Sequence, residues 1–164
     1  MDTTTNALRW VFLFLIHHPD IQDRMCTEIE GVVRRDMIPM LEDRSKLPFC
    51  EAVCFEVMRL GKGSPHTAPH TMKQDTEING CVIPKGVPVV FNLNSINSDP
   101  EIFPDPSTFN PDRFLTGDGR LQGTEKMATS SMGRRSCMGE SLAMMELFLF
   151  VMALVQRYKI KIEP

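Results

Sequence analysis

The sequence lacks any apolar run long enough to cross a lipid bilayer. Its longest apolar stretches, residues 10–16 and 147–155, fall well short of the ~18–20 residues that a spanning helix needs. The first residues also lack the pattern of a secretory signal peptide. We therefore expect neither a transmembrane helix nor a signal sequence within these 164 residues.

Excess positive charge and paired cysteines are missing as well. The net charge is -3, with 18 Lys and Arg against 21 Asp and Glu, so no general basic field is present to hold nucleic acid. The five cysteines are an odd number and include no C-x-x-C pair, which favours a reducing compartment over a disulfide framework. What is present, 42% hydrophobic and 24% charged residues, is typical of a globular chain with a packed core.

Helical periodicity is strongest near the two ends of the chain. Helices are expected from about residue 2 to Ile16, from Pro19 to about Arg35 and from Pro48 to Leu60. A fourth helix is expected from about residue 138, and its apolar residues recur at spacings of four and three, which predicts that it is largely buried. These residues are Met138, Leu142, Met145, Leu149 and Met152.

The middle of the chain changes to a β pattern. Residues 75–83 enclose the turn pair Asn79-Gly80, and residues 87–93 are rich in β-branched and aromatic side chains, so both stretches predict short strands. Residues 158–162 alternate apolar and charged side chains, as in a strand with one solvated face. The expected fold class is mainly α with small β-sheets (α+β).

The stretch from Gly133 to Glu140 carries the first candidate for chemistry. Cys137 is predicted to stand in the first turn of the last helix, where helix amides and two nearby arginines would favour a thiolate. Gly133 and Gly139 leave space on both sides of the sulfur, as a large flat ligand lying against the backbone would require. The alternative is a buried structural cysteine whose neighbouring glycines serve only turns.

Glu56 and Arg59 lie three residues apart on the predicted third helix, so their side chains are neighbours. Taken alone, they would form a solvated surface ion pair that contributes little to stability. The interpretation changes if Arg113, which follows Asn110-Pro111-Asp112, folds over the pair and completes a buried network.

A zinc site is the rival interpretation of other residues. Cys50, Cys54, His66 and His70 come close to the ligand spacing of a Cys2His2 module, which could have a nucleic-acid partner. The context disagrees, because both cysteines fall on a predicted helix and a proline directly precedes each histidine.

Four motifs, in this order and spacing, resemble the C-terminal part of a cytochrome P450, a haem-thiolate monooxygenase of the microsomal animal family 2 type. Asp2-Thr3-Thr4 matches the acid-threonine pair of the long oxygen-side helix, and Glu56-x-x-Arg59 matches the E-x-x-R motif. Pro111-Asp112-Arg113-Phe114 matches P-E-R-F, and Gly133-x-Arg135-x-Cys137-x-Gly139 matches the haem-ligand loop. The resemblance implies that residues 1–164 are a partial single domain, without the N-terminal portion, the membrane anchor and the terminal strands.

The resemblance also implies how haem would be bound. Cys137 would be the metal ligand, the axial thiolate of haem b, beside the backbone of Gly133 and Gly139. Arg135 and His70 would hold the haem propionates, since charge-assisted hydrogen bonds suit carboxylates.

Two further groups follow from the resemblance. Glu56, Arg59 and Arg113 would form a structural triad behind the haem loop. Asp2 and Thr3 would be the catalytic pair that relays protons to dioxygen, a task that needs a hydroxyl beside the oxygen and an acid to resupply it. Without the resemblance, the same two residues indicate only a helix cap.

The implied activity is that of an oxidoreductase that inserts one atom of dioxygen into a lipophilic organic substrate. An NADPH-dependent cytochrome reductase, with cytochrome b5 as a further donor, would supply electrons at the cytosolic face of the endoplasmic reticulum membrane. The alternative is a truncated, catalytically inactive product. Two residues depart from the family pattern, because Ser130 replaces the phenylalanine seven residues before the cysteine and Thr129 replaces the usual proline.

Overall fold

A computed structural model of the chain describes residues 2–61, 65–131 and 133–162, and the side chain of Asp2 lies outside that description. The α-helices are α1 Asp2–His17, α2 Pro19–Val32, α3 Pro48–Leu60, α4 Leu93–Asn97 and α5 Glu140–Arg157. The strands are β1 His70–Thr71, β2 Thr76–Ile78, β3 Cys81–Ile83 and β4 Pro88–Val89. Short 3-10 helices occupy Leu41–Lys46, Pro111–Phe114, Thr124–Lys126 and Gly133–Arg135.

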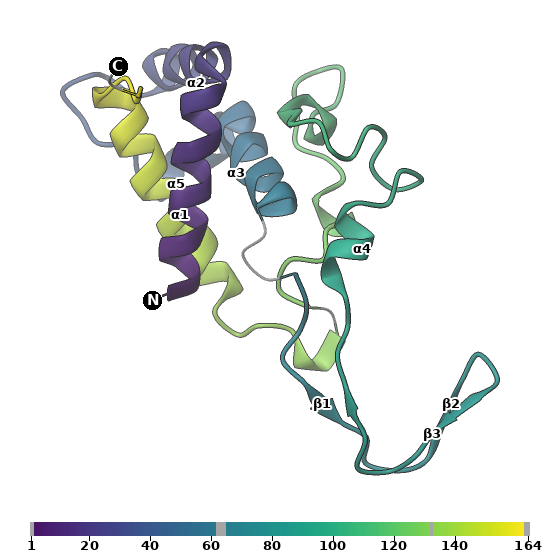
Figure 1. Ribbon diagram of the computed structural model, residues 1–164. Coiled ribbons are helices and arrows are strands. Elements are labelled where there is room, and N and C mark those ends of the chain that lie inside the picture. Colours follow the sequence, from purple (N-terminus) through teal and green to yellow (C-terminus); the bar gives the residue numbers. More distant parts are fainter. Residues whose placement is uncertain (1, 62–64, 132, 163–164) are drawn as a thin grey trace.

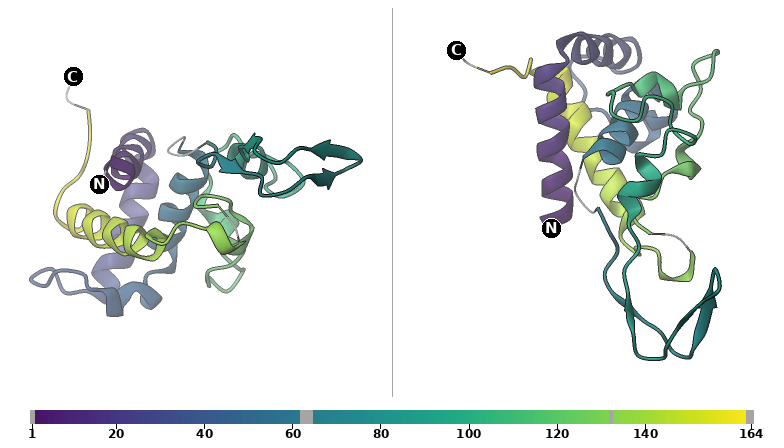
Figure 2. Two further views of the ribbon diagram at one scale, coloured as in Figure 1. Left: turned by 90° about the horizontal axis from the view of Figure 1, so that it is seen from below. Right: turned by 45° about the vertical axis from the view of Figure 1, so that its right-hand side comes forward.

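The helices and the strands occupy different ends of the molecule. Figure 1 shows α1, α2, α3 and α5 packed together, while the hairpin of β2 and β3 projects away from them, and the views in Figure 2 agree. None of the helices in the described part of the chain combines the length and hydrophobicity that a membrane span requires. The expected fold class, mainly α with small β-sheets, is confirmed.

Proline separates the first two helices. α1 ends at His17 and α2 begins at Pro19, whose fixed backbone suits a first helical position and whose missing N–H cannot continue α1. His18 lies between them, with its ring centroid 4.8 Å from that of Phe109. Both helices match their predicted positions, although α2 stops at Val32, short of the predicted end.

α3 covers the predicted residues 48–60, and a side chain from α2 caps it. The carboxylate of Glu28 accepts hydrogen bonds from the backbone N–H groups of Phe49 (3.0 Å) and Cys50 (2.8 Å). This carboxylate also places a negative charge at the positive end of the helix dipole. The cap therefore joins α2 to α3 and supports the shared core of the helical part.

The predicted hairpin is confirmed. β2 and β3 pair antiparallel around Asn79 and Gly80, which adopt φ values of 50° and 78°, as a tight two-residue turn requires. β1 and β4 form a second antiparallel pair, in which His70 lies opposite Val89.

The predicted strand over residues 87–93 is only partly right. β4 covers Pro88–Val89, and the chain then turns into α4. The side chain of Asn92 caps this short helix, because its Oδ1 accepts a hydrogen bond from the N–H of Ser95 at 3.3 Å. The cap favours a helix that starts at Leu93, although the β-branched residues of the stretch favour a strand.

α5 differs from the prediction in its start and in the part that is buried. It begins at Glu140, and the predicted core residues Met138, Leu142 and Met145 are exposed. A periodic pattern shows that a helix face is apolar, but not that another element covers it. The buried residues belong to the C-terminal half, which packs against α1 and α2; they are Leu147, Phe148, Val151, Met152 and Val155.

The alternating residues 158–162 form no strand in the described part of the chain. They continue beyond α5 in extended form, and the side chain of Gln22 from α2 takes the place of a strand partner. Its Oε1 accepts a hydrogen bond from the N–H of Ile160 at 2.6 Å, and its Nε2 donates to the Ile160 carbonyl at 3.0 Å. The predicted strand is therefore wrong, because the backbone pairs with a side chain rather than with a second strand.

Candidate functional site

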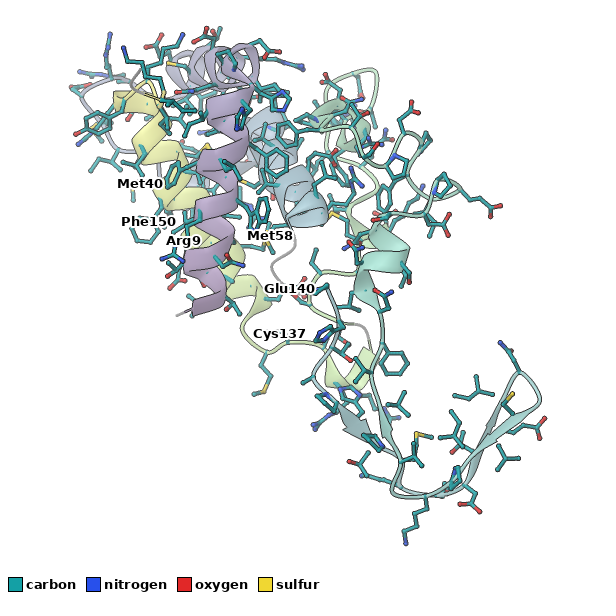
Figure 3. The ribbon with its side chains drawn as sticks, in the orientation of Figure 1. Arg9, Met40, Met58, Cys137, Glu140 and Phe150 are labelled. Atoms are coloured by element: carbon teal, nitrogen blue, oxygen red, sulfur yellow. The ribbon has the colours of Figure 1, made fainter. Side chains whose placement is uncertain are left out.

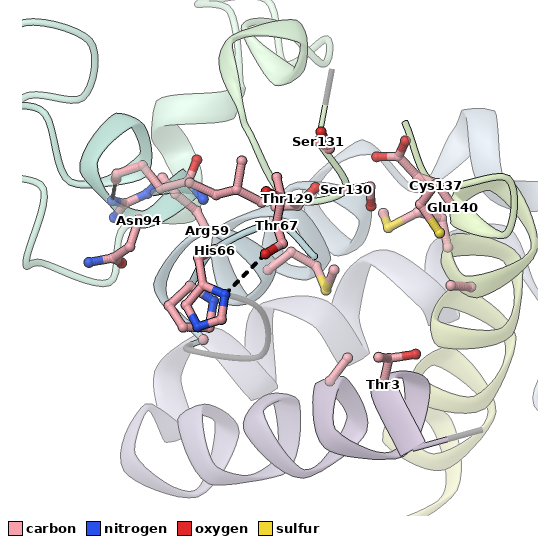
Figure 4. Close-up of a pocket in the computed structure, with 18 of the residues that line it drawn as sticks. Thr3, Arg59, His66, Thr67, Asn94, Thr129, Ser130, Ser131, Cys137 and Glu140 are labelled. Atoms are coloured by element: carbon pink, nitrogen blue, oxygen red, sulfur yellow. Dashed lines mark hydrogen bonds between the residues drawn. The ribbon is translucent and has the colours of Figure 1, made fainter. Parts of the chain in front are cut away.

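A cavity of about 350 Å³ lies where the helical part meets the β1–β4 pair. Its walls come from α1, α3, α4, β1, the segment before β1, the loop before α5 and the first turns of α5. Figure 3 labels Cys137 and Glu140, two of the residues that line the cavity, and Figure 4 shows the lining side chains at close range. A space of this size suits a small organic ligand or part of a larger one.

A short hydrogen-bonded loop presents Cys137 to the cavity. The N–H of Cys137 donates to the Ser130 carbonyl at 2.9 Å, and the N–H of Ser136 donates to the Gly133 carbonyl at 3.1 Å. Gly133 has φ +75°, a left-handed conformation in which a side chain would be strained. Because Cys137 is exposed and lines the cavity, it is not a buried structural cysteine.

The sequence predicted Cys137 in the first turn of the last helix, but Cys137 lies before α5. α5 begins at Glu140 with Gly139 as its cap, and the Glu140 N–H donates to the Cys137 carbonyl at 3.4 Å. A Cβ on Gly139 would lie 3.9 Å from the Cys137 sulfur, so glycine at this position leaves the space beside the sulfur open. Gly133 differs, because a Cβ there would meet nothing within 4 Å; its backbone conformation, not clearance, requires glycine.

Arg135 and His70 supply donors to the same cavity. Arg135 belongs to the 3-10 helix before Cys137, and His70 lies in β1 with its ring centroid 5.9 Å from that of Phe91. Within the described residues, neither side chain forms an ion pair with an acidic group. Their N–H groups are therefore able to bind the carboxylates of a ligand.

α1 supplies another wall of the cavity. Thr3, Ala7 and Trp10 line it from one face of the helix, at spacings of four and three residues. Asp2, the predicted partner of Thr3, begins α1, but its side chain lies outside the described residues. The structure thus brings Thr3 to the same cavity as Cys137, as Figure 4 shows.

Glu56 and Arg59 form a buried ion pair, not the solvated pair that the spacing alone would indicate. The Nε and Nη2 atoms of Arg59 donate to the two carboxylate oxygens of Glu56 at 2.7 and 2.9 Å. Both side chains are 0% exposed. A bidentate pair with this geometry is both directional and strong, because two charge-assisted bonds act together.

The structure brings Arg113 onto this pair. Its Nε donates to Glu56 Oε1 at 3.0 Å, and its Nη1 donates to the Pro104 carbonyl at 2.7 Å. The predicted triad of Glu56, Arg59 and Arg113 is therefore one connected cluster, which also fixes the irregular chain after α4.

Two asparagines to which the sequence interpretation gave no role complete the cluster. The N–H of Asn110 donates to Glu56 Oε1 at 2.9 Å, and Arg59 Nη1 donates to the Asn97 carbonyl at 2.7 Å. Both contacts use backbone groups, so no side-chain pattern in the sequence could have revealed them.

The two departures from the family pattern lie in the cavity wall. Thr129, Ser130 and Ser131 line the cavity beside Cys137, as Figure 4 shows. The carbonyl of Ser130, not its side chain, accepts the Cys137 N–H, so the loop keeps this hydrogen bond whatever side chain stands there. The replacement gives the cavity a polar wall where an aromatic ring would have made it apolar.

Cys50, Cys54, His66 and His70, the alternative zinc ligands, do not form a metal site in the described structure. Within the part of the chain that the structure describes, no group of three or more His, Cys, Asp and Glu side chains could hold a metal ion. Cys50 and Cys54 are buried on α3, and burial raises the pKa of Cys54 to about 12 and that of Cys50 well above its usual value. A Cys2His2 module binds zinc through two thiolates and two histidines, and in the described residues these side chains do not come together in such a group.

A family model described as Cytochrome P450 matches residues 1–164. Cytochrome P450 1A1 of Limanda limanda is 45% identical over 160 residues, and cytochrome P450 1A2 of Homo sapiens is 41% identical over 166 residues. The two alignments cover 95% and 99% of this chain, but only 30% and 32% of the relatives' own length. The names of these relatives belong to P450 family 1, whereas the sequence motifs had suggested a family 2 type.

Among solved structures, a zebrafish cytochrome P450 with abiraterone is similar to this chain, with a TM-score of 0.86 and 42% sequence identity. The match covers 95% of this chain and 37% of the other. The family match thus extends over the whole sequence, and the fold agrees with that of a solved member. The chain belongs to the cytochrome P450 family.

Proposed function

We propose that this chain is the haem-binding part of a monooxygenase that inserts one atom of dioxygen into a lipophilic organic substrate. The observation that carries the proposal is the cavity, which Thr3, His70, Arg135 and Cys137 line together from separate elements. The proposed activity is that of the whole protein, because the chain spans about a third of the length of its relatives.

The residues that line the cavity fit haem b. They include one exposed thiol, Cys137, and two side chains, Arg135 and His70, whose donors suit propionate carboxylates. Gly139 places no side chain beside the sulfur, which would leave room for haem next to Cys137. Among the five cysteines, Cys137 is the one that lines the cavity.

Cys137 would act as the thiolate ligand, and the loop around it would keep the sulfur directed at the cavity. Haem, when bound, supplies the dioxygen chemistry, which electron density from a cysteine thiolate favours. The hydrogen bond from the Cys137 N–H to the Ser130 carbonyl would hold the backbone of the ligand residue in place. Glu56, Arg59 and Arg113 would stabilise the chain behind this loop.

Thr3 would hold a proton for dioxygen at its hydroxyl group, and Asp2 would resupply it. Thr3 is suited to this role because it lines the cavity from α1, apart from the cysteine loop. A hydroxyl can both donate and accept a hydrogen bond, so it can pass a proton on without becoming charged.

The electron donor in this proposal is an NADPH-dependent cytochrome reductase, with cytochrome b5 as a further donor. The site of action is the cytosolic face of the endoplasmic reticulum membrane. Support for both comes from the resemblance to the animal relatives named above. A lipophilic substrate agrees with the apolar residues Ala7, Val57 and Leu147 in the cavity wall.

The proposal is tested by the carbon monoxide adduct of the reduced whole protein. We expect the red-shifted Soret band of thiolate ligation in the wild type and its loss in Cys137→Ala. Cys81→Ala is the matched control, because Cys81 is also exposed but lies in β3, away from the cavity lining. An unchanged band in Cys137→Ala would show that another residue binds the iron.

A further inference from the structure

Asn97 joins two regions that are far apart in the sequence. It is the last residue of α4 and is 5% exposed. Its side-chain amide binds both backbone groups of one residue in the loop before Cys137: Nδ2 donates to the Ala128 carbonyl at 3.1 Å, and Oδ1 accepts from the Ala128 N–H at 2.9 Å. Ala128 is 0% exposed, so without this amide two buried backbone groups would lose these partners.

The backbone of Asn97 makes the opposite connection. Its carbonyl accepts a hydrogen bond from Arg59 Nη1 at 2.7 Å, and Arg59 is itself bound bidentately to Glu56. All three residues are buried. One residue therefore contacts the ion-pair cluster through its main chain and the cysteine loop through its side chain.

The connection continues from Ala128 to the sulfur ligand. Ala128 is followed directly by Thr129 and Ser130, and the Ser130 carbonyl accepts the Cys137 N–H at 2.9 Å. A continuous path of hydrogen bonds and short peptide segments thus leads from α3 to the loop; in order it passes Glu56, Arg59, Asn97, Ala128, Ser130 and Cys137.

We propose that Asn97 is a positioning residue that transfers the fixed geometry of the Glu56–Arg59 cluster to the loop that presents Cys137. An amide is the suitable group, because it offers one donor and one acceptor at the spacing of a peptide unit. An aspartate would lack the donor and would direct a negative charge at the Ala128 carbonyl. The expected effect of Asn97 on haem ligation rests on the proposed function. Its expected effect on the backbone of the loop does not.

The test compares Asn97→Ala with the wild type in the whole haem-loaded protein. Amide hydrogen exchange is expected to become at least about tenfold faster at Ala128, which Asn97 contacts, and also at Cys137, which it does not contact. In the reduced protein with carbon monoxide, a larger share of the haem should lose the thiolate band. The matched control is Asn92→Ala at the N-cap of the same helix, where the asparagine is exposed. This variant is expected to leave amide exchange at Ala128 and Cys137 within about twofold of wild type.

Faster exchange at Ala128 alone, with wild-type exchange at Cys137 and a wild-type thiolate band, would overturn the proposal. If Asn97→Ala does not fold, Asn97→Asp replaces it, since the carboxylate keeps the acceptor for the Ala128 N–H but repels the Ala128 carbonyl; it must accelerate exchange at both Ala128 and Cys137. If the wild-type protein shows no thiolate band at all, the proposed function fails. In that case exchange at Cys137, measured on the protein as purified, still decides the role of Asn97.

Discussion

Cys54 lies inside the helical core, where its thiol cannot ionise as it would in water. It is 1% exposed, and burial together with the nearby carboxylate of Glu51 raises the pKa of the thiol from about 9 to about 12. The folded protein therefore keeps a proton that the unfolded chain loses above pH 9. This stabilising contribution is complete below pH 9 and is lost as the pH rises through the pKa of the folded state.

We expect the free energy of unfolding to fall by up to about 1.4 kcal/mol per pH unit between pH 9 and 12 because of this thiol. Cys54→Val, which keeps a similar volume, should flatten the decline. Urea unfolding of the whole protein across this pH range measures the free energy of unfolding of the wild type and of Cys54→Val. The difference between the two removes the contributions of other titrating groups, which both proteins share. If the free energy of unfolding falls equally with pH in both proteins, the Cys54 thiol does not contribute to the pH dependence of stability.

Thr3 is the second residue with a test of its own. Thr3→Ala in the whole protein should keep haem and substrate binding, but electrons should be diverted into peroxide and water because proton delivery to dioxygen is impaired. Product formed per NADPH consumed measures this coupling. Thr5→Ala is the control, since Thr5 is exposed on the same helix two residues further on. Equal coupling in Thr3→Ala and in the wild type would exclude the proposed role.

At the scale of the elements, the cluster around Glu56 joins α3 to the irregular segment after α4. Glu56→Ala should cost about 3–5 kcal/mol, because it leaves the guanidinium groups of Arg59 and Arg113 without their carboxylate in a buried place. Holoprotein yield and thermal unfolding measure the loss. Asp36→Ala is the control, since its ion pair with Arg34 is largely solvated and should change stability by less than about 1 kcal/mol.

Comparable yields and melting temperatures for the Glu56 and Asp36 variants would contradict the buried-cluster interpretation. The difference between the two is physical: Glu56 is fully buried, whereas the Asp36 side chain is 63% exposed. After Asp36→Ala, water can hydrate the exposed guanidinium of Arg34. After Glu56→Ala, the buried guanidinium groups of Arg59 and Arg113 have no such access to water.

The side chain of Gln22 attaches residues 158–162 to α2. Gln22→Ala should free residues 158–162 from α2, at a cost of about 1–3 kcal/mol, because two hydrogen bonds from the Gln22 side chain to the backbone of Ile160 are lost. Trypsin cleavage after Lys159 should accelerate. Asp23→Ala removes only an exposed ion pair with Lys159 and should leave the cleavage rate near wild type. Equal rates in the two variants would refute the anchoring role of Gln22.

For the molecule as a whole, the 164-residue chain expressed alone is expected to associate and to show no monooxygenase turnover, even with reductase and haem. Large apolar side chains are exposed on α1, on α5, just before α5 and on the segment after α2, and exposed apolar surface promotes association. Leu142→Gln together with Phe150→Gln should raise solubility. The exposed residues are Leu13, Met37, Ile38, Met40, Leu41, Met138, Leu142, Met145 and Phe150.

Size-exclusion chromatography at several concentrations, combined with an activity assay, checks this expectation. A soluble monomer that unfolds cooperatively and oxidises substrate would show that the chain is a self-sufficient domain. The double variant serves as the internal control, because both substituted residues are exposed and their change should not disturb the core.

Local interactions explain what could be predicted from the sequence. Pro19 and Pro48 mark helix starts because a proline ring fits only a first turn, and Asn79-Gly80 marks the hairpin because both positions need positive φ. The motif around Cys137 indicated the family through its spacing. Only its relation to α5 was mistaken, because helix boundaries depend on cap geometry that residue types specify loosely.

Contacts between distant segments decided the rest. Patterns within a few residues predict the fold class and most helix positions, and the resemblance of four motifs to a known family indicates Cys137 as the candidate ligand. Three features could be known only from the folded chain: the burial of the Glu56–Arg59 pair, the exposure of Met138, Leu142 and Met145, and the hydrogen bonds of Asn97 to Ala128. They depend on which element covers which surface, and that choice is made by packing over the whole chain, which no local pattern encodes.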